Sequence, residues 1–176
     1  LWEANKVATA FTPHPTTKEG LYVCMKDEEC GSQDGDRFIA PTDRDGCDIN
    51  AFRMGDRNFY GPGPQFQVNT ERAFKVVTRF HAPAGELTSI EQFYVQDGKD
   101  IHHPNYAVAG NDNIESDAFC AAQKTSFGDR NSFAEKGGMK AMGEALDRGM
   151  VLVISMWDDI AVSMNWLDSY MDCDPS

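Results

Sequence analysis

Residues 74–80, FKVVTRF, and residues 90–96, IEQFYVQ, decide the fold class of this chain of 176 residues. Both runs are short, partly alternating, and rich in β-branched and aromatic residues, which is typical of β-strands. Asp97 and Gly98 follow the second run and are a strong signal for a tight turn before residues 99–101. The pattern predicts strands and a hairpin in this part of the chain.

The sequence on both sides of these runs extends the prediction. Residues 150–157, MVLVISMW, are apolar on both faces, which predicts a central strand covered on both sides. One helix is predicted over residues 138–147, where Met139, Met142 and Leu146 share a face. Many strands joined by long irregular loops, with little helix, indicate an all-β sandwich.

Composition limits the class of protein and its partners. A chain of 176 residues with 41% hydrophobic and 25% charged residues fits one globular domain. No apolar run approaches the roughly 20 residues that span a bilayer. The net charge of −12 argues against nucleic acid or an anionic membrane as the partner, and it is compatible with a neutral polymer as the partner.

The cysteines suit a secreted, disulfide-bearing protein. Cys24 and Cys30 are near enough to close a small loop, whereas Cys47 and Cys120 would close a long one. Cys173 is then left over, which points to a partner outside this sequence or to a free thiol. No cysteine or histidine spacing is typical of a zinc site, so no metal is expected.

A few residues are candidates for chemistry. Glu3 directly follows Trp2, and a carboxyl group beside a large apolar ring is partly desolvated, which raises its pKa toward use as a general acid. The alternative is an ordinary surface glutamate. His14 lies between two prolines, either at a site or as a plain loop residue. Trp157 and Trp166 precede carboxylates and would suit stacking of sugar rings, or they are core residues.

Arginines among aspartates form a second group of candidates. Arg37 and Arg53 lie near Asp45 and Asp48 in the sequence. A guanidinium group could donate two hydrogen bonds to ligand hydroxyl groups, or it could form a plain surface ion pair. The sequence leaves both readings open.

Five blocks of this sequence together resemble glycoside hydrolase family 7, the secreted cellobiohydrolases and endoglucanases that cut cellulose. The blocks follow the family's order along essentially the whole chain. They are residues 1–5 (LWEAN), 12–15 (TPHP), 45–48 (DGCD), 59–63 (FYGPG) and 150–168 (MVLVISMWDDIAVSMNWLD). The resemblance implies a concanavalin-like β-jelly-roll sandwich with long loops over a concave substrate groove.

The resemblance also implies how the chain is organised. Residues 1–176 match the later part of a single family 7 catalytic domain. The family motif Glu-x-Asp-x-x-Glu, with Ala-Asn after its last residue, matches Glu3 as the general acid/base. The nucleophilic Glu and its assisting Asp are then expected before Glu3, outside this sequence. Residues 1–176 alone are therefore expected to be inactive.

The activity implied is retaining hydrolysis of β-1,4-glucosidic bonds in cellulose, with processive release of cellobiose and no cofactor. The expected partners are a cellulose chain, cello-oligosaccharides and cellobiose, and the expected form is a secreted, extracellular monomer. His14 matches a histidine beside the scissile bond, and Trp157 and Trp166 match tryptophans that stack glucosyl units. The positions that match the leaving-group side are Arg37, Arg53, Asp45, Asp48 and Asp158.

The cysteines fit the same resemblance. Two family disulfides correspond to Cys24 with Cys30 and to Cys47 with Cys120. Thr16 and Thr42 both stand where the family usually has a pair of bonded cysteines. Losing both at once leaves no orphan thiol, as expected of a folded relative.

Loop lengths bear on the subclass. Long loops over residues 24–47 and 127–138 favour a cellobiohydrolase, in which loops roof the groove into a tunnel. An endoglucanase of the same family, with a more open cleft, is one alternative. A non-catalytic β-glucan-binding module, which keeps the groove without the acid/base pair, is another. Glu3 favours the enzyme, because a pure binder has no use for that carboxyl group.

Overall fold

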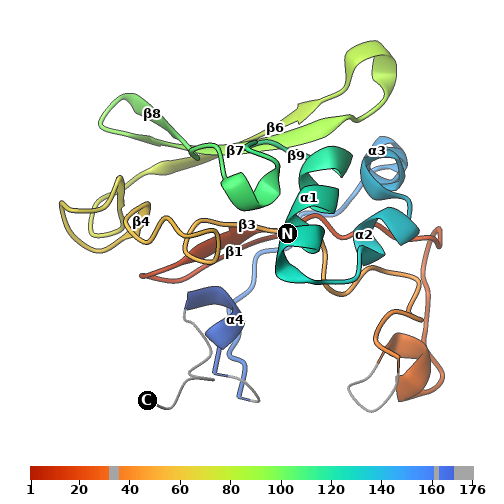
Figure 1. Ribbon diagram of the computed structural model, residues 1–176. Helices are drawn as coiled ribbons and strands as arrows, with labels where there is room; N and C mark the ends of the chain where they lie inside the picture. The colour runs from red at the N-terminus through yellow and green to blue at the C-terminus, as the bar shows by residue number, and fades with distance from the viewer. Residues whose placement is uncertain (32–35, 161–162, 169–176) are drawn as a thin grey trace.

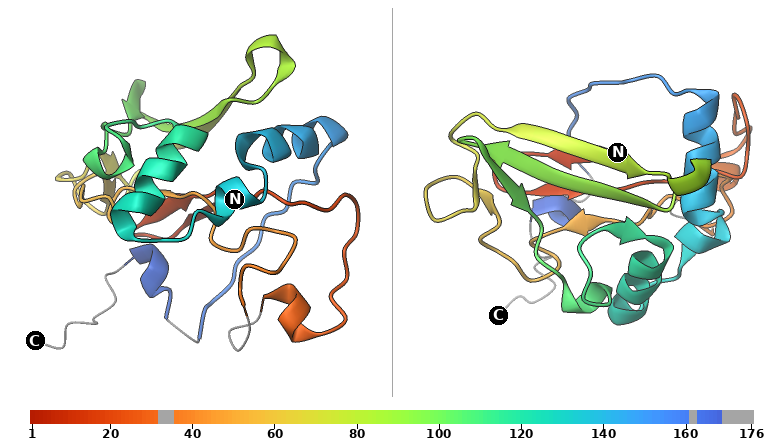
Figure 2. Two further views of the ribbon diagram at one scale, coloured as in Figure 1. Left: turned by 45° about the vertical axis from the view of Figure 1, so that its right-hand side comes forward. Right: turned by 90° about the horizontal axis from the view of Figure 1, so that it is seen from above.

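The computed structural model describes residues 1–31, 36–160 and 163–168. Its body consists of two main sheets, one above the other, with three of the helices along one side (Figure 1, Figure 2). The sheets agree with the sandwich expected from the sequence. The helices do not fit an all-β chain, because the described residues form four α-helices.

The upper sheet contains the hairpin predicted from the sequence. Its central strand β7 pairs antiparallel with each of the other strands of the sheet. Asp97 and Gly98 join β7 to β8 with φ angles of 55° and 75°. Positive φ at both residues is what a two-residue turn between twisted strands requires. The strands are β6 (Lys75–His81), β7 (Ser89–Gln96), β8 (Lys99–His102) and β9 (Glu115–Ser116).

The lower sheet is small and antiparallel. Its strands are β1 (Trp2–Ala4), β2 (Thr9–Phe11) and β3 (Ile49–Asn50), in that order. Glu3 lies opposite Ala10, and Ala10 lies opposite Asn50. Because directly paired residues point to the same face, these three side chains share one face. The alternate residues, among them Phe11 and Ile49, belong to the core.

The main core lies between the two sheets and is built around aromatic side chains. Phe59 is fully buried, packs edge-on against Tyr94 at 5.8 Å, and stacks on His103 at 4.2 Å between ring centroids. Phe11 and Ile49 reach this cluster from the lower sheet, as Ile90 and Tyr94 do from the upper one. Burying side chains of this size contributes about 1.5–3 kcal/mol each, which holds the two sheets together.

Three of the helices cover one end of the body, whereas the fourth lies below the lower sheet (Figure 1). The predicted helix over residues 138–147 is confirmed, and Met139, Met142 and Leu146 pack on the core as expected. The sequence reading missed the helix that begins after Ser116, whose side chain caps it by accepting a hydrogen bond from the N–H group of Phe119. The helices are α1 (Asp117–Phe127), α2 (Ser132–Glu135), α3 (Gly138–Arg148) and α4 (Asn165–Asp168).

The disulfides agree with the expected pairing. Cys47, two positions before β3, bonds to Cys120 of α1 and so ties this helix to the lower sheet. Cys24 bonds to Cys30 within one loop. In place of a third bond, the Thr42 hydroxyl donates a hydrogen bond of 3.2 Å to the Thr16 hydroxyl. The remaining cysteine, at position 173, lies outside the described residues.

One prediction of structure was wrong. Residues 150–157 form no strand and pair with no described strand. Val151, Leu152 and Ile154 are 87%, 86% and 90% exposed. A strand is buried only when neighbouring strands take up its backbone groups and layers cover its faces, and the described residues supply neither. We call residues 150–156 the apolar strip.

The other elements are short. No helix among the described residues is long and apolar enough to cross a membrane. These elements connect the parts of the body and are β4 (Tyr60–Gly61), β5 (Val68–Asn69), η1 (Asp27–Cys30), η2 (Pro83–Gly85) and η3 (Ala107–Ala109).

Candidate active site

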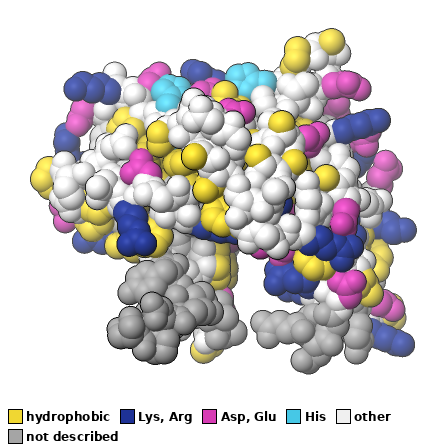
Figure 3. Space-filling view, in the orientation of Figure 1, with side chains coloured by type: hydrophobic (Ala, Val, Ile, Leu, Met, Phe, Trp, Pro, Cys, Tyr) yellow, Lys and Arg dark blue, Asp and Glu magenta, His cyan; other side chains and the backbone are white. Residues whose placement is uncertain are grey.

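A cavity of about 1160 Å³ lies on the open face of the lower sheet. The underside of the molecule is hollowed, and dark blue Lys and Arg side chains border the hollow (Figure 3). Among the residues predicted for the site, Asp158 does not line this cavity, although its neighbour Asp159 does. The predicted residues that do line it are Glu3, His14, Arg37, Asp45, Asp48, Arg53, Trp157 and Trp166.

Glu3 reaches the cavity because of the pleat of β1. Residues 2 and 4 face the core side, so the side chain of Glu3 points to the opposite face, with Ala10. Burial raises the pKa of the Glu3 carboxyl group. A raised pKa is the property that a general acid needs near neutral pH.

The reason given from the sequence for this shift needs correction. Adjacent residues of a strand point to opposite faces, so the Trp2 ring does not lie beside the Glu3 carboxyl group. Instead, the Trp2 indole N–H group donates a hydrogen bond of 2.8 Å to the hydroxyl of Thr9. Desolvation of Glu3 therefore does not come from the Trp2 ring.

His14 is held in one orientation at the cavity wall. Its Nδ1 lies 2.8 Å from the backbone carbonyl oxygen of Asp43. A carbonyl group can only accept, so Nδ1 carries the proton and Nε2 is left as an acceptor. Burial lowers the pKa of His14, so the ring is neutral at pH 7. Gly46 makes room for this ring, since a Cβ atom there would lie 2.9 Å from His14 Cε1.

The two predicted arginines form ion pairs within the cavity wall. Arg37 pairs with Asp45. Arg53 bridges Asp48 and Asp129, at 2.7 Å to each carboxylate. The guanidinium group of Arg53 also lies over the ring of Phe127, 4.1 Å from its centroid. These contacts fix the arginines, and they leave hydroxyl recognition to N–H groups that the aspartates do not occupy.

The two tryptophans also line the cavity. The rings of Trp157 and Trp166 are stacked, with centroids 5.8 Å apart and planes 11° apart. Trp166 also donates a hydrogen bond of 3.2 Å from its indole nitrogen to Asp159. The helix α4 that carries Trp166 is fixed to the lower sheet, because the Asn50 amide donates to the carbonyl oxygen of Leu167 at 2.9 Å.

Several residues at the cavity were missed from the sequence. They come from different parts of the chain and carry no shared motif or spacing, so sequence patterns offered no signal for them. Arg44, Asp159 and Asn165 are each adjacent in the sequence to a predicted residue. The missed polar residues are Arg44, Asn50, Arg57, Lys124, Asp129, Asp159 and Asn165.

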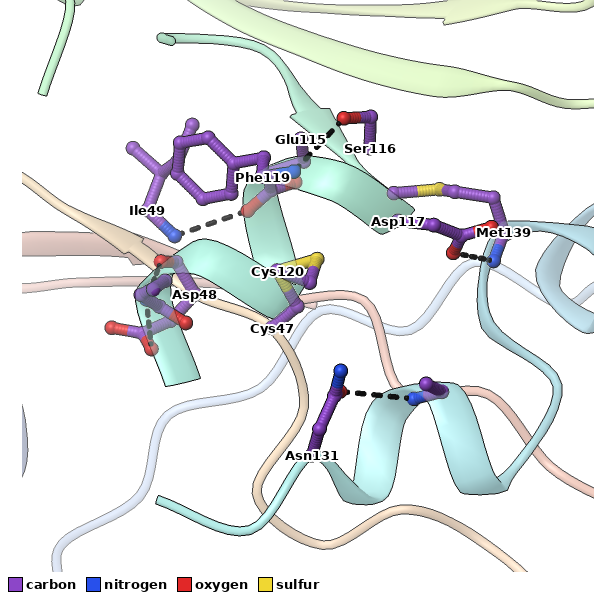
Figure 4. Close-up of a disulfide and its surroundings, with 12 residues drawn as sticks. Cys47, Asp48, Ile49, Glu115, Ser116, Asp117, Phe119, Cys120, Asn131 and Met139 are labelled. Carbon is purple, nitrogen blue, oxygen red and sulfur yellow. Dashed lines mark hydrogen bonds between the residues drawn. A yellow bond between two sulfur atoms is a disulfide. The ribbon is translucent and has the colours of Figure 1, made fainter. Parts of the chain in front are cut away.

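A buried carboxyl group lies behind the cavity, next to the long-loop disulfide (Figure 4). Glu115 is fully buried, and one of its oxygens accepts a hydrogen bond of 3.0 Å from the N–H group of Ile49. Its other oxygen has no hydrogen-bond partner among the described residues. Burial, followed by the charge of Asp48, raises the pKa of Glu115 well above its ordinary value. The group is therefore held in its protonated form in acid solution.

The described residues contain no group of three or more His, Cys, Asp or Glu side chains placed to hold a metal ion. The cavity lining supplies carboxyl groups, an imidazole and aromatic rings. A carboxyl group with a raised pKa, a neutral imidazole and exposed tryptophans are the parts that acid/base work on a polyhydroxylated ligand uses.

The family to which the chain belongs follows from comparison with known proteins. Residues 1–176 match the family described as glycosyl hydrolase family 7. The chain belongs to this family, as the resemblance of its five sequence blocks implied.

Solved structures of the family have the same fold over this length. The cellobiohydrolase of Daphnia pulex is 42% identical with a TM-score of 0.88, and 94% of this chain covers 38% of that one. A cellobiohydrolase of Melanocarpus albomyces, in complex with cellotetraose, is 39% identical with a TM-score of 0.82, and the match covers 94% of this chain and 37% of that one. The endocellulase of Humicola insolens is 40% identical with a TM-score of 0.80, covering 96% and 40%. The chain thus spans about two fifths of the length of these relatives.

Proposed function

We propose that this chain supplies the acid/base part of a retaining cellulase, which hydrolyses β-1,4-glucosidic bonds, with Glu3 as the general acid/base. The observation that carries the proposal is the position of Glu3 in the cavity, with a pKa raised by burial. Membership of glycosyl hydrolase family 7 supports the reaction class. A relative in complex with cellotetraose supports the substrate class.

In the proposed reaction, a carboxylate nucleophile attacks the anomeric carbon while the protonated Glu3 gives its proton to the leaving glycosidic oxygen. The bond from the anomeric carbon to that oxygen breaks, and a glycosyl-enzyme ester forms. Glu3, now a carboxylate, then takes a proton from water as the water attacks the anomeric carbon. The nucleophile is released and the configuration is retained.

His14 and the two tryptophans have supporting roles in this proposal. The Nε2 of His14, left as an acceptor by the bond to Asp43, accepts a hydrogen bond from a sugar hydroxyl near the reacting bond. Trp157 and Trp166 offer aromatic faces to glucosyl rings. A sugar that entered between the two stacked rings would have to separate them.

We also propose that these residues are the later part of one catalytic domain. The nucleophile would then come from a segment that the 176 residues do not include. Two observations support this proposal: the chain covers only 38% of the Daphnia pulex relative, and the apolar strip is left uncovered. Strands of the missing segment would cover the strip and complete a β-jelly-roll with a concave groove.

The subclass that we propose is a cellobiohydrolase that releases cellobiose processively. The length in sequence of the loops over residues 24–47 and 127–138 supports it, and described residues of both loops, such as Arg37 and Asp129, line the cavity. Relatives of both subclasses are similar in fold, with TM-scores of 0.82 and 0.80. Two disulfides are in keeping with a secreted, extracellular protein.

The decisive experiment is Glu3→Gln in the complete protein, with cellotetraose as substrate. Loss of the proton donor should lower the hydrolysis rate by about 10²–10⁴-fold, while the affinity for cellotetraose changes little because the amide has the same size. Glu144→Gln, at an exposed position of α3, is the matched control. Full activity of Glu3→Gln would remove the role given to this residue.

A further inference from the structure

The charges that line the cavity differ from those of the molecule as a whole. The protein carries a net charge of −12. The described residues around the cavity instead include five Lys or Arg side chains and five Asp or Glu side chains. The cavity is thus neutral by formal charge on an acidic protein. A local balance of this kind can favour a ligand of a different charge from the one that the overall composition suggests.

The carboxylates of the cavity are engaged by the protein itself. Asp45 pairs with Arg37, and both Asp48 and Asp129 pair with Arg53. Asp159 accepts a hydrogen bond from the indole of Trp166. Burial favours the neutral form of Glu3. Little negative charge is therefore left open toward a ligand.

Three cations of the cavity lack such partners. No carboxylate among the described residues forms an ion pair with Arg44, Arg57 or Lys124. Arg57 is exposed, and its guanidinium group lies over the ring of Phe52 at 5.1 Å from the centroid. Its N–H groups remain open to a ligand.

Lys124 is the strongest member of this group. It is only 3% exposed, although a lysine is almost never this buried without a partner. No hydrogen bond joins its ammonium group to a described residue, and the group is not among the fully enclosed polar atoms that lack a partner. The little surface that Lys124 exposes therefore opens into the cavity that it lines. A position in the last turn of α1 favours a cation, but supplies no counter-charge.

We propose that the unpaired cations that line this cavity, Lys124 above all, bind the carboxylate of an oxidised glucan end, an aldonic or uronic acid, in preference to a neutral sugar end. The proposal rests on the proposed function, since it names a substrate class of the same cavity. Charge-assisted hydrogen bonds from ammonium or guanidinium groups to a carboxylate are roughly twice as strong as those to a neutral hydroxyl. A partly enclosed ammonium group that meets a carboxylate also loses the cost of being buried unpaired.

The test compares two disaccharides of the same size in binding to the complete protein. Cellobionate carries a carboxylate where cellobiose has its reducing end, and calorimetry at low and high salt measures both dissociation constants. We expect cellobionate to bind about tenfold more tightly than cellobiose at low salt, with the ratio falling as salt screens the charges. A disaccharide that ends in glucuronic acid distinguishes a uronate from an aldonate.

Variants then assign the preference to its residues. Lys124→Met should lower the ratio of the two affinities by about threefold or more, and Lys124→Arg should keep it. Arg57→Gln tests the same charge at an exposed position where folding is not at risk. Lys140→Met, on the exposed face of α3 and away from the cavity, is the matched control and should leave the ratio unchanged.

The outcomes separate this inference from the proposed function. If cellobionate binds no more tightly than cellobiose while cellobiose still binds, the inference is overturned and the proposed function stands. The same holds if the preference survives both Lys124→Met and Arg57→Gln. If neither sugar nor cellotetraose binds, the proposed function itself fails.

Discussion

The two-sheet body and the apolar strip are both rich in large aliphatic and aromatic residues, yet they differ completely in burial. In the body, Phe59 and Tyr94 have no exposed surface. In the strip, Val151, Leu152 and Ile154 are almost fully exposed. The difference shows that an apolar sequence favours burial, but that its side chains are buried only where another part of the protein packs against them. The strip is thus an apolar surface that no described residues cover, whereas the core of the body is packed on all sides.

The largest effect should come from a cavity placed in the body. Phe59→Ala removes a fully buried ring that contacts both Tyr94 and His103, and should cost about 3–5 kcal/mol of unfolding free energy. Ile154→Ala, in the strip, should change the unfolding free energy of the 176-residue chain by less than about 0.5 kcal/mol. Denaturant titration measures both. An equal cost for the two would remove the distinction between body and strip.

The two disulfides provide the next test of the body. Cys47–Cys120 spans 73 positions and ties α1 to the lower sheet, whereas Cys24–Cys30 spans 6 positions of one loop. Loop-closure entropy predicts losses of about 4 and about 2 kcal/mol when each pair is replaced by alanines. Urea midpoints of the two double variants give the comparison. A larger loss for the short loop would mean that the loop carries more of the packing than its exposure indicates.

On the side of the cavity next to the strip, Trp166→Ala tests whether an exposed ring serves a ligand. Trp166 is 39% exposed and makes few contacts that folding would need. We expect the binding free energy of the complete protein for cellotetraose to become less favourable by about 1–3 kcal/mol, while the unfolding free energy changes little. Calorimetry and thermal unfolding of the same variant separate the two effects. A loss of stability without loss of affinity would return Trp166 to the core.

A smaller, pH-dependent effect is expected from Glu115, the buried carboxyl group of β9. Its pKa is raised in the folded state, so the folded state binds more protons than the unfolded one as pH rises above the ordinary carboxyl pKa. Stability is therefore greatest in acid and is lost as pH rises toward the folded pKa. The stability of Glu115→Gln relative to that of the parent protein should therefore be greater at pH 7 than at pH 4.5. Glu144→Gln, at an exposed carboxyl group, should show no such change.

Sequence reasoning worked best where the structure is local. The turn at Asp97 and Gly98 and the apolar face of α3 depend on residues close in the chain, so composition and spacing sufficed. It failed for the strip, because burial there depends on elements that the described residues do not supply. It also missed α1, although Ser116 is a local N-cap signal at the start of that helix.

The site was predictable to a similar degree. Family motifs gave Glu3, His14 and the arginines, and the cavity brings these together. The physical reason for the pKa of Glu3 was wrong, since the pleat of β1 places the Trp2 ring on the other face. Lys124 could not be found at all, because one lysine in a helix has no signal until the tertiary structure shows its burial.

The central claim is that Glu3 donates the proton to the leaving group. In the complete protein, hydrolysis rates of aryl cellobiosides with leaving groups of decreasing pKa test it most directly. A phenol of low pKa leaves without protonation. Glu3→Gln should therefore lower the hydrolysis rate by about 10²–10⁴-fold for a poor leaving group, and should slow the release of a good leaving group far less. An equal loss across the whole series would contradict the role of Glu3 as the acid.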